Sequence, residues 1–401
     1  MQHRVASGCM IALALSLPVS TAVAQAMLSV LGLLWCYQTS GQAKRQALEV
    51  HPVLKILAVL WLYIVLRTGL NFEVSGAARL EYILKWNKLL LPWILITFRY
   101  AGCHVRAHAE KAFIAVMLLT AGVGMAKSIG WLPEWGKYAD AAVFMNYLKT
   151  NYLMACAFFL LGARTIIATR LDLKNIVALG LFLLYIFFFS KGRTGYLAAG
   201  VFVLFLGVQL YPLVPRRQRL IGLILAGVSA VFLLHPESLF MGRWLQVWEG
   251  WSAVLEGDFS SSLGQRWYFI QHSWDLIQTA PIWGVGGAGF AAAFAEGADL
   301  NLLTTNPHNE YLNLAVSFGV GAFFLFGLFL LRTAQQSWYL AAWVSAFAVG
   351  CALNSWLMDF TEGTTFLLFL GLALPLGQKE SVCSPISPFP LSSPLTTGQK
   401  P

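Results

Sequence analysis

The 401-residue chain is 58% hydrophobic and carries 11% charged residues, against the roughly 25% that is typical of soluble domains. Several apolar stretches reach the roughly 20 residues that a helix needs to cross a bilayer. The composition therefore excludes an ordinary soluble domain and predicts an all-α, polytopic helical membrane protein. The net charge of +9 first reports orientation in the membrane and indicates no nucleic-acid partner.

The N-terminal stretch resembles a secretory signal, because Arg4 precedes an apolar run and Ala22-Val23-Ala24 could be cleaved. The apolar run nevertheless continues to Tyr37, which favours two short spans. In all, about twelve membrane-spanning helices are expected. They are 5–20, 22–38, 52–70, 84–99, 112–131, 150–168, 175–190, 195–211, 219–235, 311–331, 338–356 and 361–377.

Four parts follow from this pattern. Residues 1–235 hold about nine transmembrane helices, and 236–310 form one long loop with helices of its own. Residues 311–377 hold about three further transmembrane helices. The tail 378–401 is rich in Ser and Pro and is predicted to be disordered.

Basic residues predict the orientation. With a cytoplasmic N-terminus, one side of the membrane collects the loops that hold Lys44, Arg45, Arg99, Arg106, Lys111, Arg170, Lys174, Arg216, Arg217, Arg219, Arg332 and Lys379. The long loop then faces outward. Lys191 and Arg193, in the tight loop Ser190–Gly195, also fall on the outer face. They oppose the orientation rule, which indicates that something other than topology retains them.

Two amphipathic helices are expected at the membrane interface within the long loop, over 242–255 and 263–279, because tryptophans recur there at helical spacing. A third interfacial helix is expected over 79–88, with Glu81 and Lys85 four residues apart. The glycine-rich stretch 281–290 could expose backbone N–H groups to phosphate. Plain turn chemistry is the favoured interpretation, because no strand precedes it.

The stretch Asn306–Leu312 closes the long loop and opens an apolar run. Asn306 is predicted to cap a helix, with Pro307 at its first position and His308 in the first turn. The positive end of the helix dipole disfavours an imidazolium there, so a neutral His308 could accept a proton. Alternatively, His308 only hydrogen-bonds within the cap, and Glu310 only complements the dipole.

Arginine binds phosphate oxygens in a bidentate manner, and a neutral histidine can remove a hydroxyl proton. Together on an outer face they fit the transfer of a group from a diphosphate-linked lipid. The aspartates of the long loop, Asp258, Asp275 and Asp299, are dispersed, so neither a metal ion nor another cofactor is expected.

Four segments occur in an order that resembles the O-antigen ligase/polymerase family of bacterial envelope enzymes. They are Ser190–Tyr196, Gln265–Trp267, Pro281–Gly286, and Pro307–Leu312 followed by Gly319 and Gly321. The resemblance is firmest from Phe182 to Asp359. It implies a GT-C-like fold in the bacterial inner membrane, with the active site facing the periplasm.

The resemblance also implies a metal-independent, inverting glycosyl transfer from undecaprenyl diphosphate to lipid A–core. By motif, the essential histidine falls on His308 and the arginines on Arg193 and Arg266. Arg243 and Asn309 are added as substrate-binding residues. Lys191 stands where relatives often carry a small residue and is not predicted to be catalytic.

The acceptor stays open at this point. An O-antigen polymerase would use the same groups on a growing glycan, and a protein O-oligosaccharyltransferase would use a Ser or Thr side chain. The compact loop favours a ligase. A polysaccharide transporter is disfavoured, because the deep spans 175–190, 196–211 and 338–356 lack charges.

Overall fold

The computed structural model describes residues 2–100, 105–133, 141–168, 172–212, 214–216, 219, 227 and 231–376. None of these residues lies in a strand. Five helices are long and apolar enough to cross a membrane, namely α2 (Thr21–Gln38), α4 (Pro52–Gly69), α7 (Arg106–Ser128), α8 (Tyr147–Ile167) and α10 (Arg193–Leu210). Large apolar side chains remain exposed along α4, α10 and other helices, as a lipid-facing surface requires. The prediction of a helical membrane protein is confirmed.

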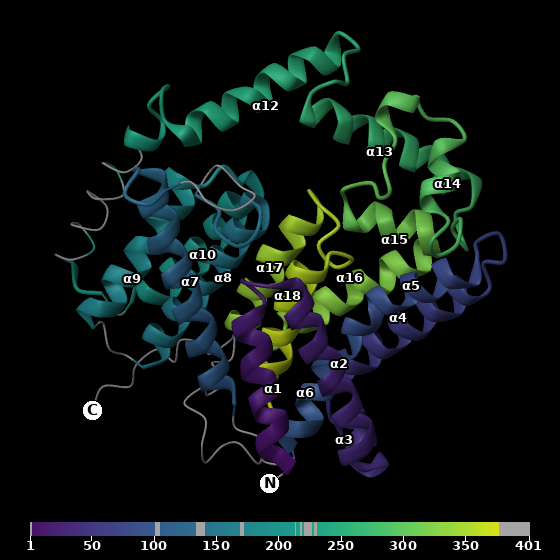
Figure 1. The fold of residues 1–401 in the computed structure, drawn as a ribbon, viewed down its shortest axis with the longest axis horizontal. Coiled ribbons are helices and arrows are strands. Elements are labelled where there is room, and N and C mark those ends of the chain that lie inside the picture. The colour runs from purple at the N-terminus through teal and green to yellow at the C-terminus, as the bar shows by residue number, and fades with distance from the viewer. Residues whose placement is uncertain are drawn as a thin grey trace, which may run out of the picture.

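The helices form three groups beneath a layer that crosses one end of the molecule (Figure 1). One group contains α7, α8, α10 and α9 (Leu173–Leu184), and α8 packs along α10. The central group contains α1 (Gln2–Ser16), α6 (Leu91–Tyr100), α17 (Trp338–Cys351) and α18 (Phe360–Ala373). The third contains α4, α5 (Gly76–Trp86), α15 (Glu310–Phe318) and α16 (Val320–Ala334).

The layer across the end is built by the long loop. Its helices are α12 (Leu239–Leu255), α13 (Ser262–Thr279) and the short α14 (Phe290–Ala295). The two longer helices confirm the amphipathic helices expected in this loop. Trp248 and Trp274 are 71% and 57% exposed, which suits indole rings at a membrane interface. Phe269, Phe290 and Phe294 form a separate small core that seats α13 and α14 on α15.

Most predicted spans are helices, but three differ from the prediction. The span 84–99 is broken into the end of α5, a 3₁₀ turn (Asn87–Leu90) and α6. The span 311–331 is broken at Gly319, and 338–356 ends at Cys351. The helix α3 (Gly41–Val50) was not predicted. The helix predicted over 79–88 corresponds to α5, where Lys85 and Glu81 pair at 3.0 Å, and its interfacial position stays a prediction.

Some predictions lie outside the described residues. They concern most of the span 219–235, the tail 378–401 and the basic residues Arg170, Arg217 and Lys379. The number of twelve spans is therefore not confirmed.

The break at Gly319 has a clear physical cause. Its φ of +82° is open to glycine, and a Cβ built there would lie 2.0 Å from the carbonyl oxygen of Ile282. The glycine-rich turn docks at this point. The N–H groups of Val285 and Gly286 donate to the carbonyls of Val316 and Ser317 at 2.8 and 3.0 Å. Since α15 already accepts these donors, the interpretation as plain turn chemistry is confirmed.

Gly319→Ala should lower the free energy of unfolding by more than about 1 kcal/mol, because alanine is strained at positive φ and its Cβ has no room. The measurement is the thermal midpoint of the purified protein in detergent. Gly321→Ala is the matched control, since a Cβ there would meet only the Tyr63 hydroxyl at 3.8 Å. Equal midpoints for the two variants would contradict the assignment of the break to Gly319.

Candidate active site

The stretch around His308 is not the helix start that the sequence predicted. Asn309 is the N-cap of α15, and its Oδ1 accepts the N–H of Leu312 at 3.1 Å. His308 therefore precedes the helix, with a φ of +50°. Asn306 supports this conformation, because its Oδ1 accepts the N–H of His308 at 2.9 Å. A residue other than glycine rarely adopts a positive φ, and it keeps this conformation only where the surrounding contacts hold it firmly.

The loop 352–359, between α17 and α18, holds this stretch from the side. Ser355 Oγ donates to Asn306 Oδ1 at 3.0 Å, and Asn309 Nδ2 donates to the carbonyl of Ala352 at 2.9 Å. One residue further, Glu310 Oε2 accepts the N–H of Met358 at 2.8 Å. His308 is thus bracketed by residues that are each tied to one loop.

Two buried charged side chains fix that loop. Glu310 is 0% exposed, and its Oε1 accepts a hydrogen bond from Asn313 Nδ2 at 3.0 Å. Lys88 is 2% exposed, and its Nζ donates to the carbonyls of Met358 and Asp359 at 2.6 and 2.7 Å. Buried polar groups of this kind are costly to leave without partners, so the pairing strongly favours one position of the loop.

Arg193 is the first residue of α10 and is placed by close packing against α8. Asn151 Nδ2 of α8 donates to the carbonyl of Gly192 at 2.7 Å. A Cβ at Gly192 or Gly195 would come within 2.9 or 2.6 Å of the Asn151 side chain. Glycine at both positions therefore allows the tight loop to approach α8 and brings Arg193 to the helix start.

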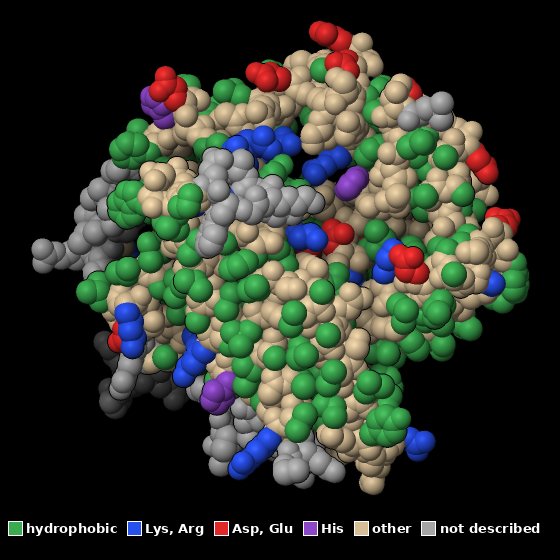
Figure 2. Space-filling model, in the orientation of Figure 1, with side chains coloured by type: hydrophobic (Ala, Val, Ile, Leu, Met, Phe, Trp, Pro, Cys, Tyr) green, Lys and Arg blue, Asp and Glu red, His purple; other side chains and the backbone are tan. Residues whose placement is uncertain are grey.

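The other two arginines, Arg243 and Arg266, lie on α12 and α13, in the layer that crosses the end of α10 where Arg193 lies. Phe240 of α12 packs on Tyr196 of α10, with ring centroids 5.2 Å apart. Arg243 follows Phe240 by one helical turn. Arg266 lies on α13, where its Nη2 donates to Asn354 Oδ1 of the loop 352–359 at 3.4 Å. Figure 2 shows Lys and Arg side chains and a histidine around a hollow beneath this layer.

His308 and the three predicted arginines lie close enough to influence one another electrostatically. Arg193 is a close electrostatic neighbour of Arg243, Arg266 of Arg193, and His308 of Arg266. None of these arginines has a carboxylate ion-pair partner within the part of the chain that the structure describes. The Nε of Arg243 is also buried without a hydrogen-bond partner there. The cluster is therefore a concentration of positive charge with unused donors, which is the property of an anion site.

The environment keeps His308 neutral at pH 7. Burial lowers the pKa of its imidazole below the ordinary value of 6.5, and the positive charge of Arg266 lowers the pKa further. The ring stacks on Phe269, with centroids 5.8 Å apart. Among the described residues nothing hydrogen-bonds to the ring nitrogens, so the nitrogen that carries no hydrogen is free to accept a proton.

Arg266 stays charged in the same place. Burial and the nearby Arg193 lower the pKa of its guanidinium, and Tyr147 raises it in part. Since an arginine starts from a pKa above about 12, it remains protonated at neutral pH.

Sequence reasoning missed several residues of this site. Tyr147, at the start of α8, is an electrostatic neighbour of both Arg193 and Arg266. Asn151 and Asn354 position the same two arginines. The polar pair Asn354-Ser355 inside a predicted span was the available signal, because an amide and a hydroxyl are unusual in a lipid-facing segment.

These groups form a cluster of arginines beside a neutral histidine. Within the described ranges, no group of three His, Cys, Asp or Glu side chains could hold a metal ion.

Comparison with known families bears on the same part of the chain. Residues 177–327 match the O-antigen ligase family. The resemblance seen in the sequence is thereby confirmed over this segment, which contains His308, Asn309 and the three arginines. It supports O-antigen ligase or polymerase-type activity. No curated protein matches the chain.

Glu310→Gln should lower the thermal midpoint, because one carboxamide oxygen cannot accept from both Asn313 and Met358. Leaving one buried donor unsatisfied costs roughly 1–3 kcal/mol. The measurement is thermal unfolding in detergent. Glu81→Gln, which removes only an exposed pair on α5, is the control. A midpoint for Glu310→Gln that equals that of Glu81→Gln would show that the buried contact does not hold the loop.

Proposed function

We propose that the protein is a glycosyltransferase that moves an O-antigen glycan from undecaprenyl diphosphate to a sugar hydroxyl of lipid A–core. The transfer would take place on the periplasmic face of the bacterial inner membrane, with inversion at the anomeric carbon and without a metal ion. The observation that carries the proposal is the meeting of His308 with three arginines that no described carboxylate neutralises.

The diphosphate of the glycan donor carries the negative charge that would neutralise this arginine cluster. Arg193, Arg266 and Arg243 would bind the diphosphate oxygens, where each guanidinium can offer paired donors. The same contacts stabilise the diphosphate as it leaves, when its negative charge increases. Asn309 is also proposed to contribute to substrate binding, although its side chain serves as the N-cap of α15.

His308 would act as the general base. Its neutral imidazole takes the proton of the acceptor hydroxyl while that oxygen attacks the anomeric carbon. The bond from this carbon to the diphosphate oxygen breaks, and undecaprenyl diphosphate leaves with the bonding electrons. Attack opposite the leaving group inverts the configuration in a single step.

The same machinery supports two other acceptors. In an O-antigen polymerase the hydroxyl belongs to a growing glycan, and in a protein O-oligosaccharyltransferase it belongs to Ser or Thr. The family match favours ligase or polymerase activity, so the protein-directed reaction comes third. A transporter is a weaker proposal, because His308 and the three arginines gather at one end of the helices and not near the middle of the spans.

Reconstitution tests the proposal directly. Purified protein, undecaprenyl-diphosphate-linked glycan and lipid A–core are combined in liposomes, with and without a chelator of divalent metals. Ligated lipopolysaccharide should form in both cases, and His308→Ala should abolish it. Near-normal turnover by His308→Ala would refute the assignment of the base. Elongated glycan without ligated product would identify a polymerase.

Arg193→Lys and Arg266→Lys should each lower the transfer rate roughly tenfold to a hundredfold. A lysine keeps the charge but loses one or more charge-assisted hydrogen bonds of roughly 1.5–3 kcal/mol each. Initial rates at saturating acceptor and varied donor measure the loss. The control is Lys191→Ala, which removes an exposed cation from the same loop as Arg193. Wild-type rates for both lysine variants would rule out bidentate diphosphate binding.

The pH profile separates the two roles of Arg266. A base must be neutral, so turnover should be constant above the lowered pKa of His308 and fall as pH drops through it. Arg266→Gln removes the positive charge that helps to lower the pKa of His308. As the solution is acidified, the residual activity of this variant should therefore begin to fall at a higher pH than the wild-type activity does. Lys191→Gln should leave the limb in place. A limb that is unchanged in Arg266→Gln would show that another group titrates.

A further inference from the structure

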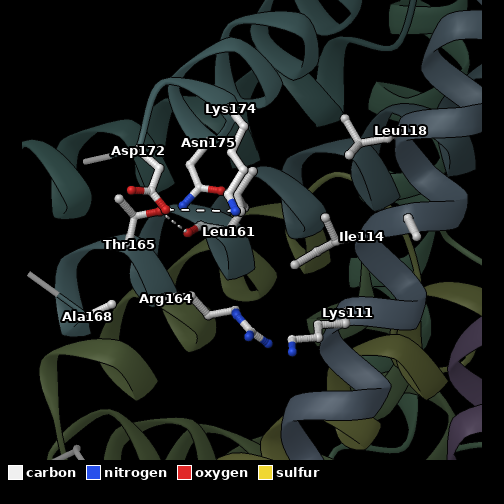
Figure 3. A pocket seen from close by; sticks show the side chains of 11 residues that line it. Lys111, Ile114, Leu118, Leu161, Arg164, Thr165, Ala168, Asp172, Lys174 and Asn175 are labelled. Carbon is white, nitrogen blue, oxygen red and sulfur yellow. Dashed lines mark hydrogen bonds and ion pairs between the residues drawn. The ribbon is translucent and has the colours of Figure 1, made fainter. Parts of the chain in front are cut away.

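A second polar site lies at the opposite end of α8. A cavity of about 370 Å³ is lined by residues of α7, α8 and the start of α9, and Figure 3 shows these side chains. Lys111, Ile114 and Leu118 form one face of α7, and Leu161, Arg164 and Thr165 form one face of α8. Arg164 follows Tyr147 by roughly 25 Å along the helix, close to the thickness of a bilayer core. This cavity is therefore distinct from the arginine cluster and lies at the other membrane face.

Positive charge at the cavity is only partly neutralised. Arg164 Nη1 donates to Glu110 Oε2 and to the carbonyl of Ala107, both at 3.2 Å. Glu110 is shared, because Arg106 Nε also contacts it at 2.7 Å. The Nε and Nη2 of Arg164 have no hydrogen-bond partner among the described residues.

Lys111 strengthens the excess of charge. Its ammonium group is exposed and has no ion-pair or hydrogen-bond partner in the described ranges. Figure 3 shows Lys111 and Arg164 extending toward one another from α7 and α8. The carboxylate of Asp172 also lines the cavity, but Lys174 lies 3.9 Å from it. An anion between Lys111 and Arg164 would turn a repulsion into two attractions.

The walls of the cavity indicate what carries that anion. Ile114, Leu118 and Leu161 continue from the cations along α7 and α8. A free phosphate would leave this apolar wall uncovered, whereas a lipid would place its phosphate on the cations and its chain along the wall.

We propose that this cavity binds an anionic glycerophospholipid of the leaflet opposite the arginine cluster. Lys111 and Arg164 hold its phosphate, and Ile114, Leu118 and Leu161 contact its acyl chain. The inference is independent of the glycosyl transfer proposed above, since it concerns a different set of residues.

Lipid titration of the full-length protein in detergent tests the proposal, with bound lipid counted by native mass spectrometry. Phosphatidylglycerol should bind in preference to phosphatidylcholine. Lys111→Gln should weaken the binding of phosphatidylglycerol roughly fivefold, as the loss of one cation near a lipid phosphate implies. Lys111→Arg should restore it. The matched control is Lys55→Gln on α4, because Lys55 is also exposed and basic.

Two further arms keep the test decisive. Ala115→Trp adds bulk at the exposed lining position between Lys111 and Leu118, so it should weaken lipid binding with all charges kept. Inorganic phosphate at the same concentrations should not compete with phosphatidylglycerol. The proposal is overturned by equal binding of both lipids, by full competition from phosphate, or by equal affinities for Lys111→Gln and Lys55→Gln.

Discussion

The buried contact between the start of α15 and the loop 352–359 is the constraint on which the candidate active site depends. Lys88 and Glu310 are almost fully buried, and each has satisfied its hydrogen bonds on this loop or beside it. Moving the loop would leave the buried ammonium of Lys88 without these partners and the buried carboxyl group of Glu310 with Asn313 alone, which is costly in a buried site. The loop in turn holds the residues on both sides of His308. The backbone of the proposed base is therefore held through hydrogen bonds that trace back to buried groups.

Charged groups have hydrogen-bond partners within this contact between α15 and the loop 352–359, whereas the arginines in the hollow have no ion-pair partner among the described residues. Beneath His308, the charged groups Lys88 and Glu310 are buried with partners. In the hollow above, the arginines face one another without a described carboxylate. Such an arrangement destabilises the empty site slightly and favours whatever anion enters it. One of the three arginines, Arg266, is also tied to the loop 352–359, through Asn354.

The sequence was sufficient for most helices and for His308 and the three arginines, because hydropathy and motif order are local signals. Prediction from the sequence failed where contacts between residues far apart in the chain determine the local structure. Asn306 and Asn309 are both suited to cap a helix, and Asn309 becomes the cap while its amide bonds to Ala352. The predicted span 338–356 is longer than α17, because the apolar side chains of Leu353, Trp356 and Leu357 extend the hydrophobic stretch past the end of the helix. Nothing near Lys88 in the sequence reveals that its partners lie some 270 positions away.

The family match and the scaffold cover different parts of the chain. His308 and the three arginines lie within residues 177–327, whereas Lys88 and the loop 352–359 lie outside them. The matched segment therefore supplies the chemical groups, but several of the contacts that orient them come from outside it. Asn354 and Ser355 reach into the segment to hold Arg266 and Asn306. A change at Asn354 or Ser355 would therefore shift Arg266 or the stretch before His308 without altering the matched segment itself.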